Sequence, residues 1–176
     1  MGRVRAILST VLLDAAQSKL TWDHWEKGAP GDVAVFAFNV PKDKSHYEVN
    51  YCCYLAAGDQ RTGIVYPFRR IAGYRGKMTV APETGTILRL MVDAELGATD
   101  PVVKAAILVE YGEVEIGGKP YVCPLRSVSK TRAEIVQTDL TYNYSLANQV
   151  QPLKNSQNDV TFSKYQVFRA DATVLY

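Results

Sequence analysis

The strongest constraint on the fold of this chain is a hairpin signal in residues 73–96. The sequence reverses at Pro-Glu-Thr-Gly, because Pro82 presets one turn dihedral and Gly85 can adopt a positive φ. In the strand that follows, apolar and charged residues alternate with a period of two, which predicts one buried and one polar face. The predicted buried set is Leu88, Leu90, Val92 and Ala94.

The polar face of this strand also carries Ile87 and Met91. These two side chains predict that part of that face meets a helix, a loop or a ligand. Ordinary packing and a ligand cavity both explain them, since most apolar strand residues belong to a core.

Further strand signals extend the hairpin into a meander. Residues 33–40 are apolar on both faces and predict a central strand, and Gly117-Gly118 favours a tight hairpin turn. Residues 20–25 alternate, with Leu20, Trp22 and His24 on one side. Weaker or shorter strand signals cover residues 46–55, 102–111, 121–130, 132–144, 160–168 and 172–176, whereas residues 150–158, with Pro152, predict a loop.

One helix is expected, at the N-terminus. In residues 4–16 an apolar stripe recurs at spacings of three and four, formed by Val4, Leu8, Val11, Leu12 and Ala15. The expected fold is therefore mainly β with this one helix, a curved antiparallel meander sheet, or half-barrel, with the helix on its concave face. Residues 1–176 form a single domain, or an excised part of a longer exported protein.

Composition excludes some functions. The net charge of +2 gives no electrostatic basis for binding nucleic acid. No apolar run reaches the length of a transmembrane segment, and no export signal is recognisable.

Three sequence segments resemble segments of a known group of proteins. They are Thr-Val-Ala-Pro-Glu-Thr-Gly-Thr-Ile-Leu-Arg-Leu in the hairpin, Val-Glu-Tyr-Gly-Glu-Val-Glu-Ile-Gly-Gly-Lys-Pro-Tyr after it, and Val-Thr-Phe-Ser-Lys-Tyr-Gln-Val-Phe near the end. The order resembles the C-terminal half of exported bacterial proteins of the outer-membrane lipoprotein-sorting and lipoprotein-carrier type, as found in uncharacterised acidobacterial proteins. The resemblance covers roughly residues 73–168.

The resemblance implies a half-barrel with a hydrophobic cavity under its helix, a periplasmic or otherwise exported location, and no catalytic residues. Related carriers shield acyl chains or bind envelope proteins in this cavity. The side chains expected to line it here are Leu8, Val11, Leu12, Trp22, Phe36, Phe38, Ile87 and Met91. The same aromatic residues are also those that strands use for core packing.

Few residues point to catalysis. Glu113 and Glu115 share a face of an extended segment, so a small hydrolase is the alternative to a non-catalytic ligand-binding or structural module. His24 and His46 lack the spacing of a metal site, and no cofactor motif is present, so neither metal nor cofactor is expected.

The three cysteines bear on whether the protein works in an oxidising cellular compartment. Cys52 and Cys53 are neighbours, and a bond between them is disfavoured because it distorts their shared peptide. We therefore expect Cys123 to pair with Cys52 or Cys53 across the sheet, which would fit an oxidising compartment. Three reduced cysteines in the core remain the alternative.

Overall fold

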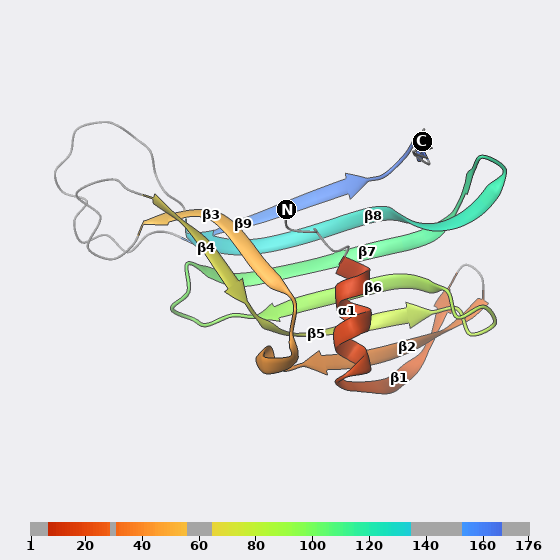
Figure 1. Ribbon diagram of the computed structural model, residues 1–176, viewed down its shortest axis with the longest axis horizontal. Coiled ribbons are helices and arrows are strands. Elements are labelled where there is room, and N and C mark those ends of the chain that lie inside the picture. The colour runs from red at the N-terminus through yellow and green to blue at the C-terminus, as the bar shows by residue number, and fades with distance from the viewer. Residues whose placement is uncertain (1–6, 29–30, 56–64, 135–152, 167–176) are drawn as a thin grey trace, which may run out of the picture.

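The computed structural model describes residues 7–28, 31–55, 65–134 and 153–166 (Figure 1). The described elements are α1 (Ile7–Ala16), β1 (Lys19–Gly28), β2 (Gly31–Val40), the 3-10 turn η1 (Lys42–Lys44), β3 (Glu48–Leu55), β4 (Val65–Ile71), β5 (Gly73–Val80), β6 (Ile87–Glu95), β7 (Val102–Ile116), β8 (Lys119–Glu134) and β9 (Leu153–Thr161). The prediction of a mainly β chain with one N-terminal helix is confirmed.

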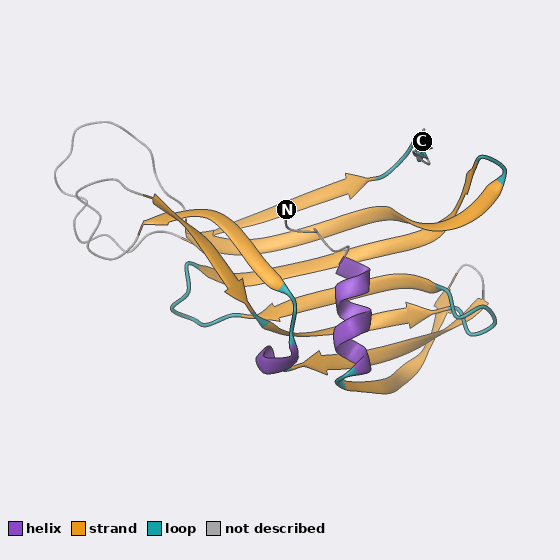
Figure 2. Cartoon of the chain, in the orientation of Figure 1, coloured by secondary structure: helices purple, strands orange, loops and turns teal. Residues whose placement is uncertain are grey.

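Seven strands form one antiparallel sheet in the order β1-β2-β5-β6-β7-β8-β9, and β3 pairs with β4 in a separate two-stranded sheet. The large sheet is not closed into a barrel, since β1 and β9 stand at opposite ends of this order. Helix α1 crosses one face of the sheet, and the β3–β4 pair lies on that face beside it (Figure 2). The chain is thus a meander whose β2–β5 connection leaves the sheet and returns.

Core packing under α1 follows the predicted alternation at Leu90 and Val92 but not at Ile87, which the alternation placed on the polar face and which packs against this core. Val11 packs against Phe38 of β2, Tyr74 of β5 and Leu90 and Val92 of β6, and all five side chains are buried. The helix begins at Ile7 in the described part of the chain, so the predicted contact of Val4 lies outside the described residues. The space between helix and sheet is therefore filled by side chains at these positions.

A buried carboxylate fastens α1 to the sheet. Asp14 is fully buried, and its Oδ2 accepts hydrogen bonds from the Tyr74 hydroxyl at 2.9 Å and from the His46 backbone N–H at 2.9 Å. Its Oδ1 lies 2.6 Å from His46 Nδ1. Burial, and next the hydrogen bond to Asp14, raise the pKa of Tyr74. A buried carboxylate needs such partners, so α1 is held in one register on β5.

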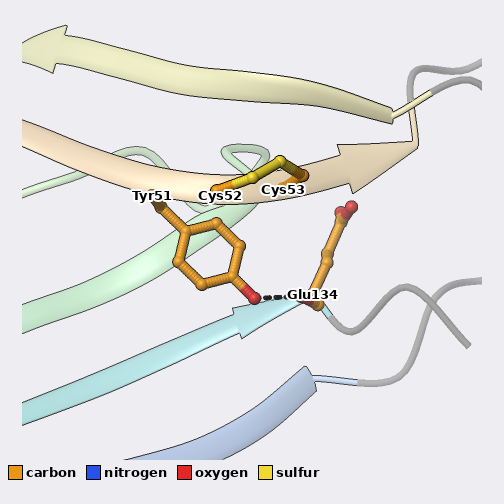
Figure 3. The surroundings of a disulfide bond; sticks show 4 residues. All are labelled: Tyr51, Cys52, Cys53 and Glu134. Atoms are coloured by element: carbon orange, nitrogen blue, oxygen red, sulfur yellow. Dashed lines mark hydrogen bonds between the residues drawn. A yellow bond between two sulfur atoms is a disulfide. The ribbon is translucent and has the colours of Figure 1, made fainter.

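The β3–β4 pair has its own anchors. Arg70 of β4 forms an ion pair with the buried Asp100, which also accepts a hydrogen bond from the Gly97 N–H at 2.7 Å. The Tyr51 hydroxyl donates to the carbonyl of Glu134 at 2.7 Å (Figure 3). A second core cluster fills the space beneath, formed by Val49, Phe68, Ala72, Ala94, Val102 and Ala133.

The opposite face of the large sheet is covered by charged side chains. Asp23 of β1 reaches Lys77 of β5 at 2.7 Å, and Glu26 of β1 reaches Arg89 of β6 at 2.5 Å. Strand β2 separates the first pair, and β2 and β5 separate the second, so both ion pairs pass over the intervening strands. The buried Val35 shows that β2 is shielded on this face too, as its apolar sequence predicted.

The turn predictions are confirmed where a positive φ is required. Gly85 has φ +70°, and Gly117 and Gly118 have φ +60° and +75°. By contrast, the predicted loop at residues 150–158 is wrong, because β9 occupies most of it. Strand β9 pairs with β8 from Leu153 to Thr161 although most of its side chains are exposed. Backbone pairing along an edge needs no apolar alternation, which explains the error.

The cysteine prediction is also wrong. Cys52 and Cys53 form a disulfide with each other, across a cis peptide bond (Figure 3). Cys123 is free. The β3–β4 pair packs against the end of β8 near Ala133, about ten residues along an extended strand from Cys123. That separation is roughly 30 Å, far beyond the reach of a disulfide.

We predict that Asp14→Ala lowers the free energy of unfolding by about 3 kcal/mol, because it leaves the buried Tyr74 hydroxyl and the His46 N–H without an acceptor. Chemical denaturation followed by circular dichroism measures the effect. Asp43→Ala is the control, since Asp43 is exposed on η1, and it should change stability by less than about 0.5 kcal/mol. Equal stability of the two variants would contradict the anchoring role.

Alkylation without reduction should label Cys123 alone in the denatured protein. The tryptic peptide of residues 45–61 contains both Cys52 and Cys53, and we expect it unlabelled and two hydrogens lighter than its reduced form by mass spectrometry. A cross-link between this peptide and the one that carries Cys123 would restore the cross-sheet hypothesis. Labelling of all three cysteines would remove the disulfide altogether.

Candidate functional site

An open groove lies at the end of the sheet where β1 ends, β2 begins and the β5–β6 turn lies. Strands β6 and β7 pair only from Arg89 to Asp93 of β6, while β7 runs on to Ile116 with β8. The two strands therefore separate beyond Arg89, as Figure 1 shows. The groove has a volume of about 660 Å³ and is lined by Trp25, Gly31, Asp32, Val33, Ala81, Pro82, Glu83, Thr84, Thr86, Leu88, Gly112 and Glu113. We call it the end groove.

A β-bulge determines which way the tryptophan of the end groove points. The register of β1 on β2 shifts between Trp22 and His24, so that Trp22 lies opposite Phe36 and Trp25 opposite Ala34. Phe36 and Ala34 are two residues apart and share a face, so both tryptophans share it as well. Each is 56% exposed, but only Trp25 lines the end groove.

Some polar side chains of the end groove have an ion-pair or hydrogen-bond partner, and others have no ion-pair partner. Asp32 is paired with Lys27 at 2.5 Å, and the Thr84 hydroxyl donates to the Thr86 hydroxyl at 2.8 Å. Glu83 and Glu113 are exposed, and neither has an ion-pair partner among the residues that the structure describes. Among the described residues, no lysine or arginine lines the groove. The site thus combines an apolar floor with two uncompensated carboxylates.

The residues expected to line a cavity under the helix are divided by the structure. Leu8, Val11, Phe38 and Ile87 come together in the packed core beneath α1. Phe36 is half-buried on β2. Three others are exposed, namely Leu12 on α1, Trp22 on β1 and Met91 on β6. Helix α1 contributes no residue to the end groove.

Met91 lines a second groove, of about 510 Å³, on the opposite face of the sheet. The charged residues that line this second groove are Lys19, Arg75, Lys77 and Asp93. Lys77 is paired with Asp23, and hydrogen bonding by Lys77 lowers the pKa of Asp23. This groove is thus predominantly basic, unlike the end groove.

The other candidate groups remain apart. Glu113 lines the end groove, whereas Glu115, also exposed, does not. His46 binds Asp14 in the helix anchor, and His24 lies 3.2 Å from Asp23 on the far face. Over the described residues, no group of histidine, cysteine and carboxylate side chains is arranged to hold a metal ion.

Sequence reasoning missed Trp25 and Glu83 as site residues. The Pro-Glu-Thr-Gly turn was recognised, but nothing in its sequence shows that it faces β7 across a gap. Strict alternation placed Trp22 and Trp25 on opposite faces, and the bulge at Asp23 overturns that prediction.

Comparison of the chain with models of known protein families, with curated proteins and with solved structures finds no match.

Proposed function

We propose that the protein is a non-catalytic binding module that holds a ligand with an apolar body, such as an acyl chain, in the end groove. The observation that carries this proposal is the exposed indole of Trp25, which lines one groove together with the half-buried Ala81 and Leu88. A volume of about 660 Å³ lies within the range of small-molecule sites.

The filled space beneath α1 favours the end groove over the helix–sheet interface that the resemblance implied. Val11, Tyr74 and Leu90 are in mutual packing there and fully buried. A ligand at that position would have to displace core side chains, at a cost of several kcal/mol. Binding in the end groove requires no such displacement.

A non-catalytic role is supported by the carboxylates. Acid-base catalysis by a carboxylate pair needs one member in a water-poor environment, which raises its pKa. Glu113 and Glu115 are both exposed.

We further propose that the module works in a bacterial envelope, as the resemblance to lipoprotein carriers implies. The Cys52–Cys53 disulfide supports this location, because disulfides persist in oxidising compartments. In the described part of the chain, no helix has the length and apolar character of a membrane span. The alternative function is a structural or interaction domain of a longer exported protein, which would bind no small ligand.

The chain has two tryptophans, so replacing one of them leaves a fluorescence signal that comes from the other alone. In Trp22→Phe the only remaining indole is Trp25, and we expect octyl glucoside, below its micelle concentration, to shift its fluorescence to shorter wavelength in a saturable manner. In Trp25→Phe, the matched control, the emission of Trp22 should stay unchanged. An unchanged spectrum in both variants would favour the structural domain, and equal shifts would indicate non-specific adsorption of the detergent.

A further inference from the structure

We infer that the ligand of the end groove carries a positive charge next to its apolar body, and that its class is an alkylammonium amphiphile. This inference rests on the proposed function and specifies its ligand. The groove offers an aromatic face and unpaired carboxylates together, and a ligand whose apolar chain carries a positive charge would contact both.

The charge of the lining is the first argument. Three carboxylates line the end groove, from Asp32, Glu83 and Glu113, and Lys27 neutralises only the first. Two negative charges thus remain in a groove that no described arginine or lysine lines. A fatty acid carboxylate would be repelled here, whereas a cation would be attracted.

The two unpaired carboxylates come from different elements. Glu83 belongs to the β5–β6 turn, and Glu113 belongs to β7 beyond the point where β7 leaves β6. Both face the same groove, so they flank the gap between these elements. A ligand cation seated in the gap can interact with both, which an isolated surface carboxylate does not offer.

Trp25 supplies the second argument. Indole is the aromatic ring that attracts cations most strongly, and its face is available here because the side chain is 56% exposed. The bulge in β1 turns this ring toward the groove side of the sheet, on the same face as Trp22. The half-buried Ala81 and Leu88, which line the same groove, then provide contacts for an alkyl chain attached to the cation.

The basic groove on the opposite face provides an internal contrast. Lys19, Arg75 and Lys77 outnumber Asp93 among its charged lining residues. A cationic amphiphile is disfavoured there, so the sign of the ligand charge should select between the two grooves. The size of the end groove also favours a small amphiphile over the large flat area that a protein partner needs.

The test uses three ten-carbon amphiphiles below their micelle concentrations, added to the full-length Trp22→Phe protein at low ionic strength and mildly alkaline pH. They are decyltrimethylammonium, decyldimethylamine oxide, which is neutral and nearly the same size, and decyl sulfate. We expect the dissociation constant of the cation to be roughly tenfold lower than that of the amine oxide, and decyl sulfate to bind weakest. Raising the salt concentration should narrow this difference.

The variant Glu83→Gln with Glu113→Gln should bind the cation and the amine oxide about equally. Glu115→Gln is the matched control, because Glu115 is exposed on the same strand but does not line the groove, and it should keep the roughly tenfold preference. All of these substitutions are at exposed positions, and unchanged circular dichroism confirms that the fold is kept.

The outcomes separate the inference from the function on which it rests. If the Trp22→Phe protein, with Glu83 and Glu113 intact, binds the cation and the amine oxide equally, the charge inference is overturned and the proposed function stands. If decyl sulfate binds more tightly than decyltrimethylammonium, the charge inference is overturned as well, and the basic groove becomes the expected binding site. Failure of all three amphiphiles to bind would overturn both.

Discussion

The buried carboxylate of Asp14 is the interaction on which the arrangement of this protein depends. A charged group without access to water is stable only with several hydrogen-bond donors, and Asp14 finds them on two separate parts of the chain, Tyr74 and His46. These contacts fix α1 on β5 and also hold the segment that leads into β3. Side chains then fill the space under the helix, so the proposed ligand site lies elsewhere.

Two irregularities of the sheet create that site. A regular β1 would turn Trp22 and Trp25 to opposite faces, whereas the bulge at Asp23 places both on one face and frees Asp23 to pair with Lys77. The second irregularity is the short pairing of β6 with β7, which leaves a gap beside the β5–β6 turn. Edge irregularities of this kind also protect a strand from pairing with other molecules.

Local patterns predicted the parts of the fold that depend on local physics. The period of two in β6 identified Leu90, Val92 and Ala94 as buried, and the glycines at the two hairpin turns have the positive φ values that their turns need. Long-range pairing was not predictable in this way. The polar β9 is a strand only because β8 offers it an edge, and the ion pair of Glu26 with Arg89 depends on strands far apart in sequence coming together. The end groove is formed by three such distant segments, so no local pattern predicts it, and the expected cavity under the helix was implied by the resemblance alone.

The central claim is that the interior beneath α1 is filled and that ligands enter the end groove. Titration of ¹⁵N-labelled protein with decyltrimethylammonium, followed by amide chemical shifts, tests it most directly. The account predicts saturable shifts at Thr84, Leu88 and Gly112, which line the groove, and none at Val11, Tyr74 and Leu90 in the core. Shifts concentrated at the core residues would contradict it and would place the ligand between the helix and the sheet.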